Sequence, residues 1–310
     1  MFSALVCTRD RPEQIERALR SLLADAGASE VIVVDQTDGS GTEAAVARLA
    51  GDARLRYIRS RRRGKGAALN EGLRLARGAI VVCTDDDCEA PPGWVHAMGQ
   101  ALEMHPSAAI TFCNVIAPPH DRRAGYVPTY ERRRSRLLRG IAATCAGHGL
   151  GAGMALRREA LLAMGGCDES IGPGARFPSG DDWDLAHRVL LRGWHVYECA
   201  ELSIVHHGFR SFAEGREHAR RDWIAIGAVC AKPLRAGYWS AAVVGLWEFT
   251  AHALWPPIGD LLRLRRPRGF GRVAGFVQGF FAGLWTRVDR EKVLFEAAPP
   301  RARAEGSRGG

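Results

Sequence analysis

The sequence lacks several features that mark common classes of protein. Its 310 residues include eight cysteines but no C-x-x-C pair, which argues against a zinc ribbon or a disulfide framework. No stretch free of Asp, Glu, Lys and Arg reaches the roughly 18–20 residues of a membrane-spanning helix. The first apolar run, residues 2–6, is short and has no basic leader, so we expect no signal peptide. Together these absences favour a cytoplasmic chain with reduced cysteines.

Two common nucleotide-binding motifs are also missing. The first predicted strand, residues 2–7, is followed by Thr8-Arg9-Asp10-Arg11-Pro12 instead of G-x-G-x-x-G, so the dinucleotide-binding fingerprint is excluded at its usual place. The chain contains no G-x-x-x-x-G-K-[ST], which excludes a P-loop.

The composition is that of a globular protein with a basic C-terminal part. Apolar residues make up 46% of the chain and charged residues 25%, too apolar and too evenly charged for disorder. Residues 231–310 carry 13 basic and 6 acidic groups, which accounts for +7 of the net charge of +9. Such a segment favours an anionic partner, either a membrane surface or nucleic acid.

Apolar runs alternate with helical patterns along the first part of the chain. We predict strands at residues 2–7, 31–34, 55–58, 79–83 and 109–116. We predict helices between them, the first with Asp10 as its N-cap. This alternation predicts an α/β fold with a mostly parallel sheet covered by helices on both faces. Residues 117–150 interrupt the pattern and predict a long functional loop.

Three aspartates, Asp85-Asp86-Asp87, directly follow a buried strand. The carboxyl ends of parallel strands are where such sheets bind ligands. Asp85 and Asp87 share an orientation in extended chain while Asp86 points away, and paired carboxylates suit Mg²⁺ or Mn²⁺. The alternative is a solvated acidic turn that caps the next helix. The strand context favours a site.

Two further residues stand where a nucleotide could bind. Asp35 ends the β-branched run 31–34 and could accept hydrogen bonds from a base or ribose, or simply terminate the strand as an Asx-turn residue. Lys65 lies between two glycines at a predicted helix start, which suits phosphate. On local evidence alone, a surface lysine in a glycine turn is the simpler interpretation.

A second acidic group begins a predicted helix at residues 181–191. Asp181, Asp182 and Asp184 follow Gly180, where they could cap the helix or supply a general base. His206 and His207 follow a predicted strand at 196–205. One of them could be a metal ligand, or both could be structural.

Taken in order, these segments resemble the family 2 glycosyltransferases of the GT-A fold, over approximately residues 2–210. The resemblance rests on Val6-Cys7-Thr8-Arg9-Asp10-Arg11-Pro12, Val31-Ile32-Val33-Val34-Asp35, Gly66-Ala67-Ala68-Leu69-Asn70-Glu71-Gly72, Asp85-Asp86-Asp87, Ala155-Leu156-Arg157-Arg158, Gly165-Gly166-Cys167-Asp168-Glu169, Gly180-Asp181-Asp182-Trp183-Asp184-Leu185 and Val205-His206-His207. The order and spacing of these segments are specific, although each is modest alone.

The resemblance implies an enzyme that transfers a sugar from a nucleoside diphosphate donor, a UDP-sugar by preference, to an acceptor hydroxyl with inversion at the anomeric carbon. It implies a bound Mn²⁺ or Mg²⁺ and a role in polysaccharide or glycolipid assembly. The acceptor would be a saccharide or a lipid-linked saccharide.

The same resemblance assigns roles to individual residues. The nucleotide-binding residues would be Thr8, Arg9, Asp35, Lys65 and Asp85. Asp87 would bind the metal with His206, and Asp182 would be the catalytic base. Asp181 and Trp183 would support the base or contact the acceptor. Asp181 stands where the family usually has Glu, and Gly153 and Cys167 also depart from its pattern, so the donor sugar cannot be transferred from a relative.

The C-terminal part has its own character. Residues 236–259 include three tryptophans and one charged residue, and five arginines follow within residues 263–272. This pattern fits an element lying on an anionic cytosolic leaflet, or a helical cap over the catalytic domain. Glycines at 271, 275, 279 and 283 predict close helix packing. No nucleic-acid motif accompanies the arginines, so we expect no nucleic-acid partner.

We therefore expect a catalytic domain at residues 1–210, a helical, membrane-associated region at 211–296 and a disordered tail at 297–310. Two other functions remain open. One is a noncatalytic carbohydrate- or lipid-binding module, and the other is a nucleotidyltransferase on a related fold.

Overall fold

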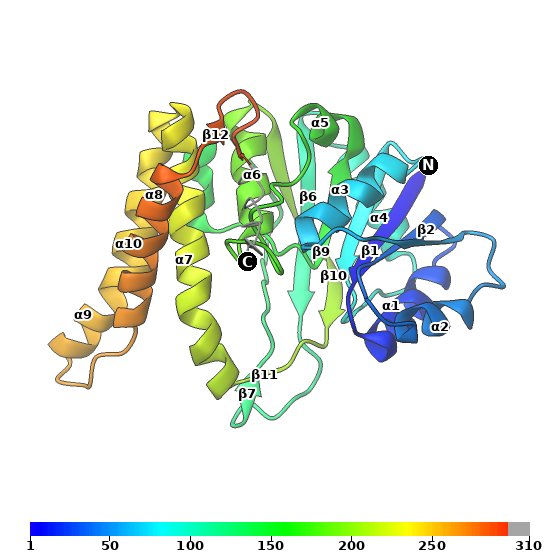
Figure 1. Ribbon diagram of the computed structural model, residues 1–310, viewed down its shortest axis with the longest axis horizontal. Helices are drawn as coiled ribbons and strands as arrows, with labels where there is room; N and C mark the ends of the chain where they lie inside the picture. Colours follow the sequence, from blue (N-terminus) through cyan, green and yellow to red (C-terminus); the bar gives the residue numbers. More distant parts are fainter. Residues whose placement is uncertain (297–310) are drawn as a thin grey trace, which may run out of the picture.

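The computed structural model describes residues 1–296, so the tail expected at 297–310 lies outside the described residues. A nine-stranded sheet forms the centre of the molecule (Figure 1). Its strands are β1 (Phe2–Thr8), β2 (Ala28–Asp35), β3 (Leu55–Arg59), β4 (Ile80–Asp85), β5 (Cys88–Glu89), β6 (Ala108–Ile116), β8 (Arg136–Leu138), β9 (Gly153–Arg157) and β10 (His195–His206). The strand order is β3-β2-β1-β4-β9-β6-β10-β5, and β8 also pairs with β10.

Most strands of this sheet run in one direction, as predicted. β1 is parallel to β2 and β4, β2 is parallel to β3, and β6 is parallel to β10. β9 is inserted antiparallel between β4 and β6. The fold is therefore the predicted α/β type with one reversed central strand.

The register of the strands aligns their carboxyl ends at one edge. Thr8 pairs with Asp35, and Cys7 pairs with Asp85. On the other side of β9, His206 pairs with Cys88. Polar residues that follow different strands thus meet at the same edge of the sheet.

Helices cover both faces of the sheet. They are α1 (Pro12–Leu23), α2 (Gly41–Ala47), α3 (Lys65–Leu75), α4 (Trp94–Glu103), α5 (Arg158–Ala163) and α6 (Asp181–Leu191). Successive residues of β1 enter opposite cores: Ala4 and Val6 pack with α1 and α4, whereas Leu5 packs with α3 and α6. This alternation is the physical basis for a sheet with two apolar faces.

One local expectation is wrong. Asp10 does not cap the first helix: it has a φ of 57°, and α1 begins two residues later with Pro12 after Arg11. The backbone N–H of Asp10 donates to Thr37 Oγ1 instead. A proline at the first helical position needs no donor partner, so the helix starts without a side-chain cap.

The long excursion at 117–150 contains short elements that the sequence pattern did not predict. β7 (Gly125–Tyr126) pairs with β11 (Arg210–Ser211) in a separate two-stranded sheet, and a 3₁₀ helix spans Ile141–Ala146. Figure 1 shows β7 and β11 at the end of the molecule to which the arrowhead of β6 points.

The C-terminal part is helical, as expected. It consists of α7 (Phe212–Ala236), a 3₁₀ turn (Trp239–Ala241), α8 (Ala242–Trp247), a π-helical segment (Glu248–Leu254), α9 (Trp255–Leu262), α10 (Phe270–Trp285) and the hairpin of β12 (Val288–Asp289) and β13 (Leu294–Phe295). Within the described residues, no helix has the length and apolar character needed to cross a membrane.

Glycines bring α10 close to α7, side by side in Figure 1. A Cβ on Gly279 would meet the carbonyl oxygen of Ile224 at 1.8 Å, and one on Gly283 would meet the carbonyl oxygen of Ala228 at 2.9 Å. The predicted close packing is therefore confirmed. Gly271 is the exception, because a Cβ there meets nothing within 4 Å.

Candidate active site

The acidic triplet lies at the carboxyl end of β4, but its side chains do not alternate as predicted. Only Asp85 belongs to the strand, and Asp86 and Asp87 form a turn. Asp86 is buried, accepting hydrogen bonds from Thr8 Oγ1 at 2.8 Å and Arg11 Nη1 at 2.9 Å. Burial raises the pKa of Asp86, although the Arg11 charge opposes this. Asp86 therefore fastens the end of β4 to the loop after β1, and it shares Arg11 with Asp87 rather than pointing away from it.

Lys65 joins the triplet to the second acidic group. Its Nζ lies 2.5 Å from Asp85 Oδ1 and 3.8 Å from Asp181 Oδ2. Burial lowers the pKa of Lys65, but the charges of Asp85 and Asp181 outweigh it and raise the pKa well above its ordinary value. Burial raises the pKa of Asp181 to about 6, although the charge of Lys65 opposes this shift. The ammonium group of Lys65 thus brings together two acidic segments that are about 100 residues apart in the chain.

Asp182 is held at the start of α6, next to this group. Gly180 precedes the helix with a φ of 80°, a conformation that favours glycine. The backbone N–H of Gly151 donates to Asp182 Oδ2 at 2.8 Å, and a Cβ built on Gly151 would lie 3.6 Å from Lys65 Nζ. Asp182 and Lys65 therefore line the same space.

Trp183 lies behind the site. It is 7% exposed, and its ring packs against His187 at a centroid distance of 4.5 Å and stacks with His148 at 6.0 Å. This placement suits the support of Asp182 by packing.

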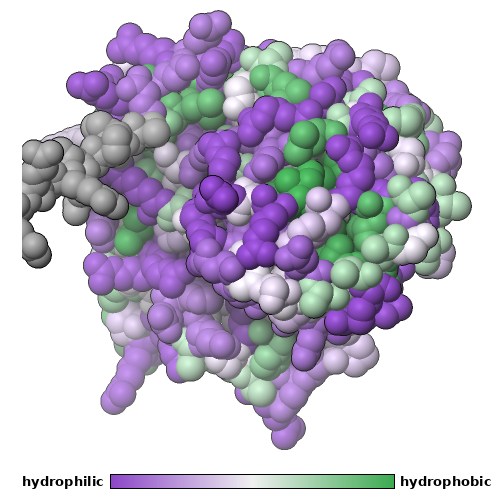
Figure 2. Space-filling view, turned by 45° about the vertical axis from the view of Figure 1, so that its right-hand side comes forward, coloured by the Kyte–Doolittle hydropathy of each residue, from purple (hydrophilic) through white to green (hydrophobic). Residues whose placement is uncertain are grey.

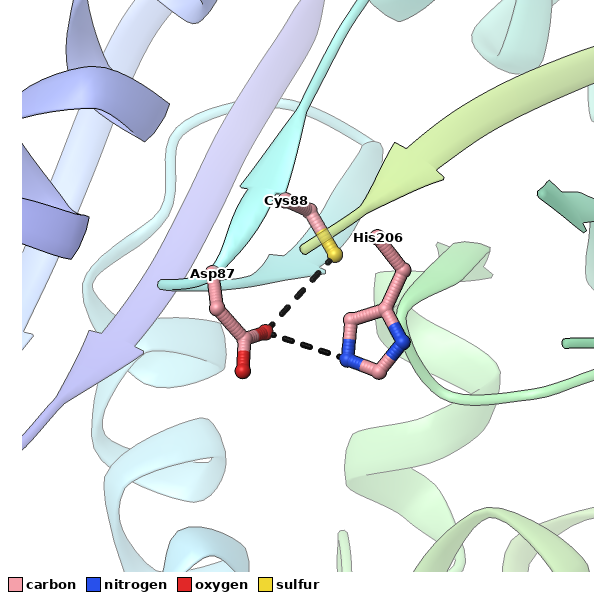
Figure 3. Close-up of side chains that lie close together, drawn as sticks. All are labelled: Asp87, Cys88 and His206. Atoms are coloured by element: carbon pink, nitrogen blue, oxygen red, sulfur yellow. Dashed lines mark hydrogen bonds and ion pairs between the residues drawn. The ribbon is translucent and has the colours of Figure 1, made fainter. Parts of the chain in front are cut away.

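Asp87 and His206 face each other at the other end of the triplet, with Cys88 beside them (Figure 3). His206 Nε2 lies 3.3 Å from Asp87 Oδ1, and Cys88 Sγ lies 4.0 Å from the same oxygen. Burial lowers the pKa of His206, but hydrogen bonding to Asp87 outweighs it and raises the pKa. Burial raises the pKa of Asp87, but the hydrogen bond with His206 and its charge outweigh burial, so the pKa of Asp87 is lowered.

This pair has the properties of a divalent cation site. Nδ1 of His206 donates to the carbonyl of Pro128 at 3.0 Å, which leaves Nε2 facing Asp87 as a ligand nitrogen. A Cβ at Gly208 would lie 2.6 Å from His206 Nε2 and 2.9 Å from Asp87 Oδ2, so glycine keeps open the space that both ligand atoms face. A carboxylate and an imidazole suit Mn²⁺, and the carboxylate also suits Mg²⁺.

Asp35 and Arg9 stand apart from this group. Asp35 is completely buried, accepting hydrogen bonds from Thr37 N–H at 2.8 Å and Tyr57 O–H at 2.7 Å. The side chain of Arg9 is 49% exposed and pairs with Asp10 at 3.3 Å. Arg9 follows β1 and Asp35 ends β2, at the same edge of the sheet, but their charged groups have other partners.

Some residues of the site were missed by reasoning from the sequence. Arg11 lies within the Thr8–Pro12 segment and could have been noticed there. Cys88 follows the triplet, but a buried cysteine gives no distinctive signal. Gly151, Gly208 and Pro128 act through backbone contacts with distant residues, which no local pattern encodes.

Comparison with known proteins identifies the family. The chain belongs to the family described as Glycosyl transferase family 2, whose model matches residues 3–164. The succinoglycan biosynthesis protein ExoU of Rhizobium meliloti is 26% identical over 289 residues, which cover 88% of this chain and 81% of that protein. The succinoglycan biosynthesis protein ExoO of the same organism is 36% identical over 96 residues, only 30% of this chain and 27% of that protein.

Solved structures show the same fold. The mannosyltransferase PcManGT from Pyrobaculum calidifontis, in complex with GDP-Man and Mn²⁺, superposes with a TM-score of 0.61 at 22% identity, covering 92% of this chain and 87% of that one. S. aureus TarS 1–349 gives a TM-score of 0.63 at 14% identity, covering 90% of this chain and 80% of that one. The protein is therefore a glycosyltransferase of the GT-A fold, which favours transfer chemistry over the noncatalytic module and the nucleotidyltransferase.

Proposed function

We propose that the protein is a metal-dependent inverting glycosyltransferase that moves a sugar from a nucleoside diphosphate sugar to an acceptor hydroxyl. The observation that carries this proposal is the position of Lys65 between Asp85 and Asp181. It brings the start of α6, with Asp182, to the edge of the sheet where the acidic triplet ends. A base and a site for a charged leaving group are thus close together.

Asp87 and His206 are the proposed ligands of Mn²⁺ or Mg²⁺. A bound dication would stabilise the negative charge that develops on a diphosphate as the glycosidic bond breaks. Arg11, whose Nη1 lies 3.3 Å from Asp87 Oδ2, adds positive charge on the same side. The carbonyl of Pro128 orients the ring of His206, and Gly208 leaves room beside His206 Nε2 and Asp87 Oδ2.

Asp182 is the proposed general base. An acceptor hydroxyl must lose its proton as it attacks, because its alkoxide is too basic to exist free at neutral pH. Inversion needs one base on the face opposite the leaving group. The Gly151 N–H fixes one carboxylate oxygen of Asp182, which limits the orientations of the other. Asp181 and Trp183 are proposed to support this geometry through Lys65 and through packing.

The proposed donor is a UDP-sugar, and its nucleotide would lie at the ends of β1 and β2. Thr8, Arg9, Asp35, Lys65 and Asp85 are the proposed contacts. Among the similar solved structures, S. aureus TarS 1–349 and GalNAc-T7 are in complex with UDP and PcManGT is in complex with GDP-Man, so a nucleoside diphosphate is common to them. We propose uridine because two of these similar structures contain UDP.

The proposed acceptor is a saccharide or a lipid-linked saccharide in polysaccharide or glycolipid assembly, in keeping with the two succinoglycan biosynthesis relatives. We further propose that residues 211–296 rest on the cytosolic face of a membrane while residues 1–210 carry out catalysis. Large apolar side chains are exposed throughout this C-terminal part: Trp239, Val243, Leu246, Trp247, Trp255, Leu261, Leu262, Leu264, Phe270, Val277, Phe281 and Trp285.

The extent of exposure supports a membrane partner for this part. Trp239, Trp255 and Trp285 are 76%, 61% and 87% exposed. One exposed tryptophan would need no explanation, but three of them among many exposed apolar side chains indicate a binding surface. Five arginines lie between Trp255 and Trp285 in the sequence: Arg263, Arg265, Arg266, Arg268 and Arg272. Figure 2, with the α1 and α2 side turned forward, shows a largely hydrophilic surface with a few limited apolar patches. Tryptophan with arginine is typical of proteins that bind an anionic lipid surface.

A donor screen tests the enzymatic proposal. Nucleotide release from UDP-, GDP- and dTDP-sugars would be measured with Mn²⁺, with Mg²⁺ and with EDTA. We expect release from a UDP-sugar that needs the metal and is lost in Asp87→Asn. Glu103→Gln, an exposed change at the end of α4, is the matched control. Full activity in EDTA would contradict the metal assignment.

Co-sedimentation with vesicles tests the membrane proposal. We expect binding to vesicles containing phosphatidylglycerol that falls as salt is raised, and weaker binding to pure phosphatidylcholine. The double change Trp255→Ser and Trp285→Ser should reduce binding, whereas Met104→Ser, an exposed residue outside the C-terminal part, should not. Equal sedimentation of all three proteins would contradict the proposal.

A further inference from the structure

Exposed aromatic side chains also gather at one place apart from the exposed tryptophans and phenylalanines of residues 239–285. Within residues 1–238, the tryptophan, tyrosine and phenylalanine side chains that are exposed are Tyr126 at 36%, Phe209 at 45% and Phe212 at 47%. All three belong to the β7–β11 sheet or its flanks, although Tyr126 is more than 80 residues from the other two in the chain. The ring centroids of Tyr126 and Phe212 lie 6.2 Å apart.

These rings border an open groove of about 680 Å³. This volume lies in the range of roughly 300–1,000 Å³ typical of small-molecule sites. The lining combines Tyr126 and Phe212 with His120, Arg122 and Glu131. Arg122 and Glu131 are exposed, and neither forms an ion pair within residues 1–296. Their hydrogen-bonding groups are therefore free to meet a ligand.

The groove shares a wall with the proposed metal site. Val127 and Thr129 line it, and Pro128 between them accepts the hydrogen bond from His206 Nδ1. Phe209 follows Gly208, the glycine that leaves room over Asp87 and His206. A ligand in the groove would therefore have one end close to the proposed metal site.

The groove lies away from the proposed nucleotide contacts. Thr8 and Asp35 end β1 and β2, on one side of β4 in the sheet order. The groove adjoins the end of β6 and the start of α7, beyond β9 on the other side of β4. The two regions could hold two substrates with the triplet between them.

The chemistry of the groove fits a saccharide. A pyranose presents C–H groups on its faces, which pack on the electron-rich faces of aromatic rings, and hydroxyls around its rim. Arg122 supplies donors and Glu131 supplies acceptors for such hydroxyls. A purely apolar ligand would make no use of these two charged groups.

We propose that this groove binds the acceptor saccharide, with a sugar ring packed against Tyr126 and Phe212. The inference rests on the proposed function, since it names the acceptor subsite of the same reaction. It assigns Tyr126 and Phe212 as determinants of acceptor affinity and leaves donor binding to the other side of the triplet.

The test measures binding of soluble sugars by the full chain, using saturation-transfer difference NMR. The probes are methyl β-glycosides of glucose, galactose, mannose and N-acetylglucosamine, each with Mn²⁺ and UDP present. The variants are Phe212→Leu, which keeps apolar volume but removes the flat ring, Phe212→Trp, which keeps a ring, and Tyr126→Leu. Met104→Leu, remote and exposed, is the control. Affinity for UDP is measured separately by calorimetry.

We expect at least one glycoside to bind, with affinity reduced about fivefold or more in each leucine variant of Phe212 and Tyr126. Phe212→Trp and Met104→Leu should keep the wild-type affinity, and UDP affinity should be the same in all proteins. Binding of no glycoside, or equal binding by the leucine variants, would overturn the proposal. Ring-dependent glycoside binding by a protein that binds no UDP would support the groove and contradict the donor assignment instead.

Discussion

Replacing Lys232 with methionine should strongly destabilise the protein. Lys232 is completely buried, and its Nζ lies 2.7 Å from Asp168 Oδ2 and 2.5 Å from Asp184 Oδ1. Arg188 is the second buried cation, 3.8 Å from Asp184. Two cations and two carboxylates therefore balance in the interior, and the substitution leaves one negative charge in excess.

The expected cost follows from this imbalance. Removing one partner from a buried ion pair typically costs about 3–5 kcal/mol, because the remaining charge is uncompensated. Methionine keeps most of the apolar volume of lysine, so little of the cost comes from lost packing. Burial already raises the pKa of Asp184 although Lys232 opposes the shift, and the variant should raise that pKa further.

Urea unfolding followed by circular dichroism measures the effect. We expect Lys232→Met to lower the free energy of unfolding by about 3–5 kcal/mol. The double variant Lys232→Met with Asp168→Asn restores neutrality, and the asparagine oxygen can still accept from the Phe295 N–H, at the loss of the hydrogen bond that Asp168 Oδ1 accepts from the Ser170 N–H. It should recover at least about 1 kcal/mol of that loss. A single variant that loses less than about 1 kcal/mol, or a double variant less stable than the single, would refute the reasoning.

Three further predictions, made with four substitutions, test other contacts. Gly279→Ala should lower the melting temperature because its Cβ would overlap a carbonyl oxygen of α7. Gly271→Ala is the control and should be neutral or slightly stabilising, because a Cβ there meets nothing within 4 Å. Equal effects of the two substitutions would contradict the close packing of α7 and α10. Gly208→Ala should weaken Mn²⁺ binding in calorimetry by filling the space over Asp87, and unchanged binding would contradict that site. Burial raises the pKa of Glu248 from 4.5 to about 7, so the folded protein loses stability as the pH rises from 4.5 to 7, and the full cost is present above 7. Glu248→Gln should therefore raise the melting temperature at pH 8, and this gain should shrink as the pH falls from 7 to 4.5. A gain of the same size at pH 4 would contradict the assignment.

The sequence was sufficient to predict the regular elements of the fold. Continuous, largely apolar runs predicted β1, β2 and β4 because both faces of those strands are buried. The helix predicted at 181–191 has the bounds observed for α6, since Gly180 and the acidic first turn mark its start. The glycines of α10 predicted close packing because only a nearby backbone explains them.

Other features depend on contacts that no local pattern encodes. β5, β7 and β11 have two residues each, too few for a periodic signal, and they exist because distant strands pair with them. Asp35 is completely buried and accepts a hydrogen bond from Tyr57 on the neighbouring strand. This contact is set by the register of the two strands. The position of Lys65 between Asp85 and Asp181 likewise arises from the packing of α3 and α6 against the sheet, so local reasoning identified only a lysine in a glycine turn.

The central claim is that Asp182 acts as the base in the crevice where Asp87 holds the metal. The most direct measurement compares UDP binding and sugar transfer in Asp182→Asn with the wild-type protein, both with Mn²⁺. Loss of the base should lower the rate of transfer by about 10²–10⁴-fold while the affinity for UDP and Mn²⁺ stays the same. Transfer at the wild-type rate by correctly folded Asp182→Asn would contradict the account.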